Sequence, residues 1–435
     1  MAAKRSGKER EGRKTADGGV EAKALGQIPE YGDAAVISRR AAARLRGGHV
    51  WVYRSDVTAL PEGAASLLPV HDARGALLGT ALYSPTSEIA LRLISREEVA
   101  SEAEWLEILA ERMRAAIALR SDVLASADTN ACRLIFSEAD DLPGLIADKY
   151  GEIVVLQLLA KALDNDAVRI VATNVLREAL HPAVIVERPD ARIRELEQLS
   201  APLDGPPLYV RDELELQTVF RLNGLNFHYD AAAGQKTGAF LDQRENYAAA
   251  ARHAHGDALD VCTYQGGFAL HLACNHEARV CDRVTGIDVS RVALEVAERN
   301  LAANRDALRA EVDWVEANAF DLLRDWSQSG VMYDTIVLDP PAFAKSKRAV
   351  EGALRGYKEL NLRALKMLRP GGTLVTCSCS HHVSLADFTA VVAAAAGDAG
   401  RRVRLIERRG AAADHPVILT IPETEYLKCL ICEVE

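Results

Sequence analysis

The sequence lacks the features that mark secreted and membrane proteins. It has no run of 18 apolar residues, which excludes an ordinary transmembrane helix. Residues 1–14 are charged rather than apolar, so we expect no secretory signal. The eight cysteines show no regular spacing, which is typical of reduced thiols rather than of a disulfide framework. A cytoplasmic protein is therefore expected.

Excess positive charge is also absent. The formal net charge is -10, so any binding of nucleic acid must come from local basic patches. The hydrophobic content of 49% and the charged content of 26% are those of an ordinary globular protein. A length of 435 residues predicts two or three domains.

Residues 1–33 lack the apolar side chains that a folded segment needs. They are rich in Lys, Arg, Glu and Gly, and residues 1–14 carry six Lys and Arg against two Glu, a net charge of +4. Such a composition predicts a disordered basic tail. An inert tail and an arm that touches RNA are both compatible with this composition.

Residues 34–103 contain five short apolar runs separated by turn sequences, which predicts a small β barrel. Its first part has arginines and aromatic residues but no acid before Arg54. Cations beside aromatic rings suit phosphate contact and base stacking. The alternative is a solvated helix face followed by a core strand. The candidate RNA contacts are Arg39, Arg40, Arg44, Arg46 and Trp51.

Residues 104–212 predict a small α/β unit. A helix is indicated from Glu102 to about Leu124 by apolar residues at three- and four-residue steps. Two strands, 132–136 and 153–159, are expected on either side of an acidic turn. The acids of that turn lack the spacing of a metal site, so we interpret them as turn and surface residues. They are Glu138, Asp140 and Asp141.

From residue 213 to residue 435, strands and helices alternate. This order predicts a doubly wound, mostly parallel sheet, and so an α/β fold. Ile336, Val337 and Leu338 are consecutive apolar residues, as expected for a strand buried on both faces. Two prolines end this strand directly after Asp339. Asp339 is thus placed at the carboxyl end of a central strand, where open α/β sheets bind ligands.

A complete G-x-G-x-x-G motif is missing from this region. Gly266 and Gly267 follow the first strand, and glycines let the backbone approach a ligand closely. Asp288 comes 21 residues after Gly267, where an acid can bind the hydroxyls of a ribose. Asn318 follows the third strand and can contact an adenine edge. The pattern favours a nucleoside ligand without a pyrophosphate, such as S-adenosylmethionine, over the nicotinamide cofactor of an oxidoreductase.

Six short motifs together resemble the RlmI-type 23S ribosomal RNA cytosine-C5 methyltransferases. They are Gly-Gln-Lys-Thr-Gly at 234–238, Leu-Asp-Gln-Arg at 241–244, Tyr-Gln-Gly-Gly-Phe at 264–268, Asp-Pro-Pro-Ala-Phe at 339–343, Arg-Gly-Tyr-Lys at 355–358 and Ser-Cys-Ser at 378–380. The resemblance implies a PUA-like barrel and a small α/β domain before a Rossmann-like domain that binds S-adenosylmethionine. The cofactor residues it implies are Lys236, Tyr264, Gly266, Gly267, Asp288, Asn318 and Asp339.

The resemblance also implies a reaction. Cytosine C5 is a poor nucleophile, and a thiolate that adds to C6 activates it; a base must then remove the C5 proton. Cys379, in the Ser-Cys-Ser motif, is the expected nucleophile, and Cys377 is its local competitor. Asp339 is expected to hold the cytosine edge. Two alternatives stay open on the same fold, a methyltransferase that acts on a base nitrogen and a non-catalytic RNA-binding protein of ribosome assembly.

Two further patterns are weak. Cys429 and Cys432 have the spacing of metal ligands, but residues three apart on a strand point to opposite faces, so we expect no metal site. Asp414 and His415 can supply a general base or an RNA contact, or can belong to an ordinary loop. A homodimer is possible, although nothing in the sequence requires it.

Overall fold

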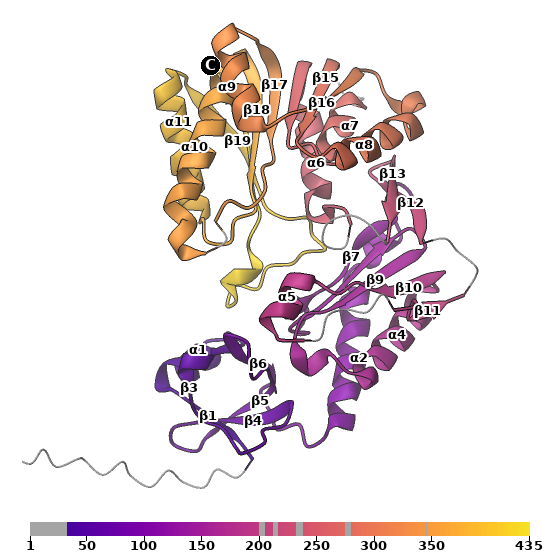
Figure 1. The fold of residues 1–435 in the computed structure, drawn as a ribbon, viewed down its shortest axis with the longest axis vertical. Helices are drawn as coiled ribbons and strands as arrows, with labels where there is room; N and C mark the ends of the chain where they lie inside the picture. The colour runs from indigo at the N-terminus through magenta and orange to yellow at the C-terminus, as the bar shows by residue number, and fades with distance from the viewer. Residues whose placement is uncertain (1–32, 200–204, 212–215, 232–237, 275–279, 345) are drawn as a thin grey trace, which may run out of the picture.

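The computed structural model describes residues 33–199, 205–211, 216–231, 238–274, 280–344 and 346–435. The described chain forms three large sheets and one two-stranded sheet. Figure 1 shows a barrel, a middle body and a C-terminal sheet in succession. The predicted basic tail lies outside the described residues except for Asp33. No helix in the described ranges is long and apolar enough to cross a membrane.

The first sheet is the predicted small barrel. Its elements are β1 (Ala35–Ile37), α1 (Arg39–Arg46), β2 (Trp51–Tyr53), β3 (Val57–Ala59), β4 (Leu67–Asp72), β5 (Leu77–Tyr83) and β6 (Ile89–Ser95). The strands lie in the order β2-β6-β5-β4-β1-β3. Strand β3 has no counterpart among the predicted strands because it is only three residues long and none of them is buried.

The basic segment of the barrel is helix α1. The side chain of Ser38 caps it by accepting a hydrogen bond from the backbone N–H of Ala41 at 3.2 Å. Ala41, Ala42 and Leu45 face the core, and Arg39 and Arg40 are exposed. A solvated helix face followed by a core strand therefore describes the local structure. That description is compatible with RNA binding by the exposed arginines.

The second sheet forms the middle body, with strand order β11-β10-β9-β8-β7. Its elements are α2 (Glu102–Ala118), α3 (Ser121–Leu124), β7 (Ala131–Phe136), β8 (Leu145–Tyr150), β9 (Ile153–Leu158), α4 (Asp166–Leu180), β10 (Val184–Glu187), α5 (Ala191–Leu196) and β11 (Tyr209–Val210). Helices α2 and α4 pack on this sheet and share its apolar core.

Two predictions for the middle body are wrong. Strand β8 lies between the two expected strands, and β7 and β9 each pair with it rather than with one another. This strand was not predicted because it contains an acid, Asp148. In the structure Asp148 is buried and forms an ion pair with Arg133 at 2.7 Å. Asp140 is not a surface residue either. It is buried against Arg120, with nitrogen–oxygen distances of 2.7 and 2.8 Å.

The third sheet is the predicted doubly wound sheet, preceded by the hairpin β12 (Gln217–Leu222) and β13 (Leu225–Asp230). Its strands are β14 (Gly256–Val261), β15 (Cys281–Asp288), β16 (Glu311–Glu316), β17 (Tyr333–Leu338), β18 (Leu368–Ser378), β19 (Val403–Arg409) and β20 (Lys428–Val434). The helices are α6 (Arg244–His253), α7 (Gly267–Ala273), α8 (Arg291–Ala303), α9 (Ala319–Ser329), α10 (Val350–Met367) and α11 (Leu385–Ala399).

The order of this sheet is β16-β15-β14-β17-β18-β20-β19, and its first five strands are parallel. Strand β20 runs antiparallel between β18 and β19. Because β14 lies between β15 and β17, the winding direction changes there, which opens a crevice at the carboxyl edge of the sheet. The predicted ligand edge is thus present in the fold.

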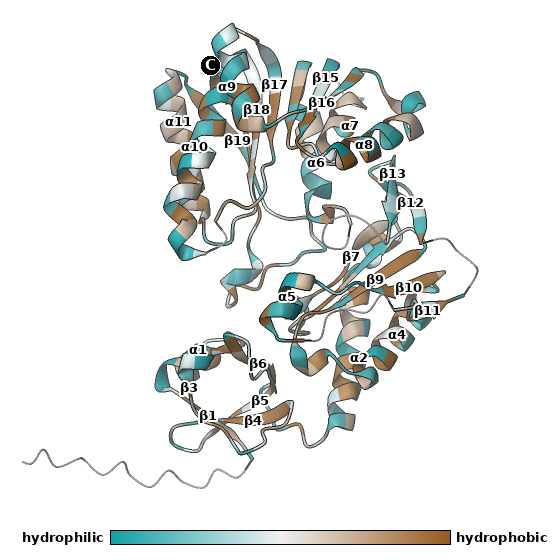
Figure 2. Ribbon diagram, in the orientation of Figure 1, coloured by the Kyte–Doolittle hydropathy of each residue, from teal (hydrophilic) through white to brown (hydrophobic). Residues whose placement is uncertain are grey.

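Strand β17 confirms the prediction of burial on both faces. Val337 belongs to the core on one face of the sheet, and Ile336 and Leu338 belong to the core on the other. All three are at most 1% exposed. Figure 2 shows the strands of the sheets as largely hydrophobic and the outer helices as mixed. The strand ends at Leu338, and Asp339 is the first residue beyond it.

Candidate active site

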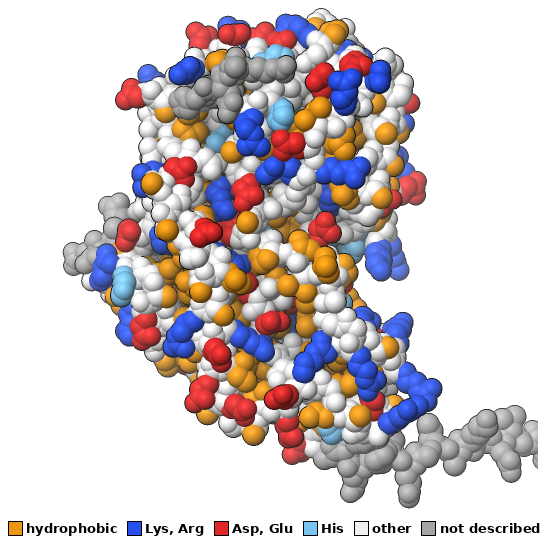
Figure 3. Space-filling model, turned by 180° about the vertical axis from the view of Figure 1, so that it is seen from behind, with side chains coloured by type: hydrophobic (Ala, Val, Ile, Leu, Met, Phe, Trp, Pro, Cys, Tyr) orange, Lys and Arg blue, Asp and Glu red, His pale blue; other side chains and the backbone are white. Residues whose placement is uncertain are grey.

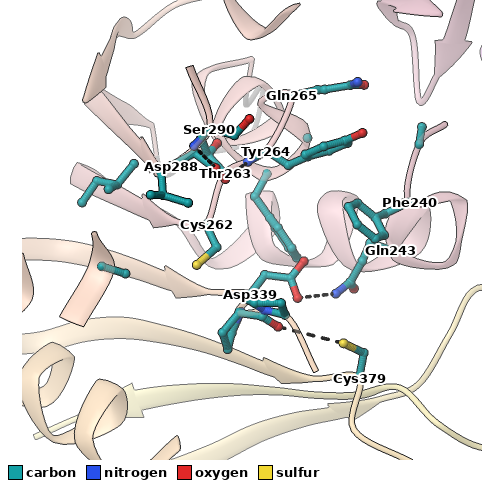
Figure 4. A pocket seen from close by; sticks show the side chains of 18 of the residues that line it. Phe240, Gln243, Cys262, Thr263, Tyr264, Gln265, Asp288, Ser290, Asp339 and Cys379 are labelled. Atoms are coloured by element: carbon teal, nitrogen blue, oxygen red, sulfur yellow. Dashed lines mark hydrogen bonds between the residues drawn. The ribbon is translucent and has the colours of Figure 1, made fainter. Parts of the chain in front are cut away.

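A pocket of about 340 Å³ opens at the carboxyl edge of the third sheet. Its volume suits a small-molecule ligand. The loops after β14, β15, β17 and β18 supply most of its walls (Figure 4). Gly266 lies behind the wall, and Lys236 lies outside the described residues. The predicted residues that line the pocket are Tyr264, Gly267, Asp288, Asn318, Asp339 and Cys379.

The loop after β14 has a strained backbone. Cys262 and Tyr264 have positive φ angles of 64° and 52°, and Gly266 has one of 84°. A side chain on Gly267 would place its Cβ 2.6 Å from Cζ of Tyr247. Strained non-glycine residues of this kind cluster at ligand sites. The two glycines therefore allow this tight loop, and Gly267 lines the pocket.

Asp260 of β14 forms hydrogen bonds with this loop and with the start of α7. It is absent from the predicted site. It is fully buried, and one of its oxygens accepts hydrogen bonds from the hydroxyl of Thr263 at 2.5 Å and the N–H of Ala269 at 2.9 Å. Burial raises the pKa of Asp260 to about 7. The available signal was an acid inside the apolar run 258–262.

Asp288 lies at the end of β15, on the pocket wall. One carboxylate oxygen accepts the N–H of Tyr264 and the other accepts the N–H of Ser290, each at 2.9 Å. Because a carboxylate oxygen can accept more than one hydrogen bond, both retain capacity for ribose hydroxyls. Asn318 uses its side-chain oxygen to cap α9 through the N–H of Phe320 at 2.9 Å. These donors and acceptors fit the predicted S-adenosylmethionine site.

Asp339 is oriented by Gln243. The amide nitrogen of Gln243 donates to the carboxylate of Asp339 at 3.0 Å, and its amide oxygen accepts a hydrogen bond from Asn246 at 2.7 Å (Figure 4). The second bond fixes which end of the amide faces Asp339. Gln243 is absent from the predicted site, although it belongs to the Leu-Asp-Gln-Arg motif.

Cys379 and Cys377 have different surroundings. Cys379 is the first residue after β18; it is half-buried, and its Sγ lies 4.0 Å from the carbonyl oxygen of Pro340 (Figure 4). Cys377 is fully buried opposite Cys429 on β20. Its hydrogen bond with Cys429, together with burial, raises its pKa well above the ordinary value. Of the two, only Cys379 lines the pocket.

One carboxylate that lines the pocket, Asp242, is absent from the predicted site. Asp242 is 7% exposed, and one of its oxygens accepts the hydroxyl of Tyr426 at 2.5 Å. Its other oxygen, Oδ1, has no hydrogen-bond partner among the described residues. A buried acceptor of this kind at a pocket wall is available to a ligand or a proton.

Asp414 and His415 do not line the pocket. Asp414 is buried and accepts hydrogen bonds from the N–H of Arg133 and the guanidinium of Arg244, both at 2.9 Å, and it contacts His415 at 3.1 Å. Arg120 also donates to its carbonyl oxygen. This network joins the middle body to the third sheet, so the segment is an anchor rather than an ordinary loop.

Most arginines of the predicted RNA surface form ion pairs. Arg40 and Arg44 contact Asp56 at 2.9 and 3.2 Å, and Arg46 contacts Asp72 at 2.5 Å.

Arg39 has no ion pair within the described ranges, and it lines a small surface pocket with Arg46 and Arg74. The ring nitrogen of Trp51 donates to Glu138 of the middle body at 2.9 Å. Figure 3 shows Lys and Arg side chains along one edge of the barrel.

The Cys429–Cys432 pair lies on β20, and both thiols are buried. The described residues contain no group of three His, Cys, Asp or Glu side chains placed to hold a metal ion.

Comparisons with known proteins agree with this geometry. Residues 36–96 match the PUA-like domain, and residues 187–421 match the S-adenosylmethionine-dependent methyltransferase family. Ribosomal RNA large subunit methyltransferase I of Pseudoalteromonas translucida is 37% identical over 394 residues, which cover 90% of this chain and 96% of that protein. The protein of the same name from Vibrio cholerae is 35% identical over 396 residues, with the same coverage.

Solved structures show the same fold. SMU.776, a methyltransferase crystallised with SAH, has a TM-score of 0.76 and 19% identity, over 92% of this chain and 99% of that one. A SAM-dependent methyltransferase from Streptococcus mutans gives the same values. S-adenosylmethionine is the cofactor of this chain, and its pocket residues fit that group. The chain belongs to the S-adenosylmethionine-dependent methyltransferase family that contains ribosomal RNA large subunit methyltransferase I.

Proposed function

We propose that the chain methylates C5 of a cytosine in 23S ribosomal RNA through a covalent adduct between Cys379 and C6. The relatives at 35–37% identity are named for the RNA of the large ribosomal subunit, which supports this substrate and a cytoplasmic location. The observation that carries the proposal is the position of Cys379. Its thiol faces the cofactor pocket beside the Asp-Pro-Pro loop.

The proposed chemistry begins with the thiolate of Cys379. Its sulfur forms a bond to C6, and the electrons of the C5–C6 double bond move so that C5 becomes nucleophilic. S-adenosylmethionine supplies the electrophilic methyl group. A base then takes the C5 proton, the double bond forms again, and the thiolate leaves C6.

Two of the pocket carboxylates, Asp339 and Asp242, are proposed to act on the cytosine. Asp339, held by Gln243, is proposed to bind the edge of the cytosine and stabilise its protonated form. Asp242 is proposed as the acceptor of the C5 proton, because its Oδ1 is a buried acceptor at the pocket wall without a partner among the described residues. Tyr426 fixes its other oxygen.

The cofactor roles of the strand-end residues remain part of this proposal. Asp288 is proposed to bind the ribose and Asn318 to contact the adenine. Tyr264 and Gly267 are proposed to form the wall against the cofactor, and Gly266, with its positive φ angle, to shape the loop that carries them. Of the two other expected cofactor residues, Asp339 lines the same pocket, and Lys236 is proposed on the resemblance alone.

The barrel is proposed to capture the RNA. Arg39 is the arginine most free to contact phosphate, since Arg40, Arg44 and Arg46 are partly neutralised by Asp56 and Asp72. The exposed side chains of Arg40 and Arg46 can still contact an RNA backbone, and Arg44, which is half-buried, can do so less. Trp51 is proposed to contact RNA only with the part of its ring left exposed beside Glu138.

Substitution of Cys379 tests the covalent mechanism. An RNA with 5-fluorocytosine should trap the parent enzyme, because C5 then has no proton to lose. Cys379→Ser should abolish trapping and turnover while leaving cofactor binding intact, and Cys377→Ser should abolish neither. Turnover by Cys379→Ser near the parental rate would replace this mechanism with methylation of a base nitrogen.

A further inference from the structure

Lys428 is buried beside the proposed nucleophile. It is the first residue of β20 and is 4% exposed. Its Nζ donates to the carbonyl oxygen of Ser380 and to that of Tyr426, both at 2.7 Å. Ser380 directly follows Cys379, so the first of these bonds holds the ammonium next to the thiol-bearing turn. An ammonium has three protons, and the two carbonyls use two of them.

No carboxylate forms an ion pair with Lys428 in the part of the chain that the structure describes. A buried ammonium without a counterion is strongly disfavoured. Burial accordingly lowers the pKa of Lys428 to about 8, while Cys379 and Glu425 act in the opposite direction. At neutral pH Lys428 is therefore still mostly protonated. A thiolate at Cys379 would provide the counterion that this ammonium lacks among the described residues.

The titratable groups around Cys379 differ in charge. Among the described residues, the titratable groups that act on it, share its pocket wall or lie beside it include Asp339 after β17, Tyr357 of α10, His381, Tyr426 before β20 and Lys428. Asp339 opposes a thiolate by its negative charge. A nucleophilic cysteine needs a nearby cation or dipole to form its thiolate, and Lys428 is a buried cation held at the residue that follows Cys379.

We propose that Lys428 is a positioning residue that stabilises the thiolate of Cys379. This role rests on the proposed covalent mechanism, and it explains how the thiol of Cys379 becomes the thiolate that attacks C6. It also gives a reason for keeping a lysine at a buried position where an apolar residue would fold at lower cost.

The test is the pH dependence of Cys379 alkylation in the full-length protein. Iodoacetamide reacts with the thiolate, and peptide mass spectrometry reports the modification of Cys379 separately from the other cysteines. Lys428→Met should move the midpoint of alkylation to higher pH and slow the reaction at neutral pH by about tenfold, the effect of one pH unit. Trapping by 5-fluorocytosine RNA should slow similarly, with unchanged cofactor affinity.

Lys149→Met is the matched control. Lys149 of β8 also donates to two backbone carbonyls, those of Asn130 at 3.4 Å and Gly151 at 2.6 Å, and burial lowers its pKa. Its loss should leave the alkylation profile of Cys379 unchanged. Lys428→Arg retains the charge and should restore most of the parental profile.

An unchanged alkylation midpoint in Lys428→Met overturns the proposal for Lys428, whatever the trapping experiment shows. Absence of trapping in the parent overturns the covalent mechanism instead, so the two failures are distinct. If Lys428→Met does not fold, Cys379→Ala supplies the reciprocal measurement. NMR titration of the Lys428 side chain should then show a lower pKa than in the parent, and an equal pKa would refute the pairing.

Discussion

Replacement of Asp414 by Asn should weaken the anchor between the middle body and the third sheet. Hydrogen bonds and charges from His415, Arg244 and the N–H of Arg133 outweigh burial and lower the pKa of Asp414 from 3.8 to about 2. A difference of nearly two units corresponds to about 2 kcal/mol of stability. Asp414→Asn should therefore lower the free energy of unfolding by about 2 kcal/mol at neutral pH, measured by urea denaturation.

The pH dependence of this loss gives a sharper test. Because the folded pKa is depressed, the contribution of the carboxylate is complete above the unfolded pKa and disappears as the pH falls through the folded one. The difference between parent and variant should thus be constant down to about pH 4 and shrink toward about pH 2. Asp321→Asn, at an exposed pair with Arg324, should cost less than about 1 kcal/mol. A loss at Asp414 no larger than at Asp321 would refute the anchor.

Three further predictions concern the active site and the barrel. Asp288→Ala should weaken S-adenosylmethionine binding by about 1.5–3 kcal/mol in calorimetry, as loss of charged hydrogen bonds does; unchanged affinity would remove Asp288 from the site. Asp242→Asn should accumulate the covalent adduct on ordinary cytosine RNA, seen as a shifted band on a denaturing gel, because Asn cannot take the C5 proton; absence of this band beside normal turnover would exclude Asp242 as the base. Arg39→Ala should reduce the salt slope of RNA binding by about one, and Arg40→Ala should reduce it less; equal slopes in all three proteins would remove the barrel arginines from phosphate contact.

The strand-end residues were predictable because their placement depends on local sequence. A run of three apolar residues before Asp339 and two prolines after it determines both a buried strand and its end. The order of strands and helices then brings Gly267, Asp288 and Asn318 to the same edge. No knowledge of side-chain partners was needed for that step.

Residues that depend on distant partners were not predictable in the same way. Lys428 and Tyr426 contact Ser380 and Asp242 only because β20 pairs with β18 from the C-terminal end of the chain. Strand β8 was not predicted because it contains Asp148, whose partner Arg133 lies on another strand. The arginines of α1 looked unpaired because Asp56 and Asp72 lie beyond the basic segment. In each case the position of a polar residue depends on an ion pair or a strand pairing with a residue far away in the sequence.

The pairing of β18 with β20 also explains why two cysteines two residues apart have different chemistry. Cys377 still lies in the regular ladder opposite Cys429, so its thiol remains in the core. The ladder ends at Ser378, opposite Lys428, and Cys379 is the first residue free to turn toward the pocket. The same last pair places the Lys428 ammonium against the Ser380 carbonyl. A single strand pairing therefore buries one thiol, leaves the other at the pocket wall, and places a cation at the residue that follows it.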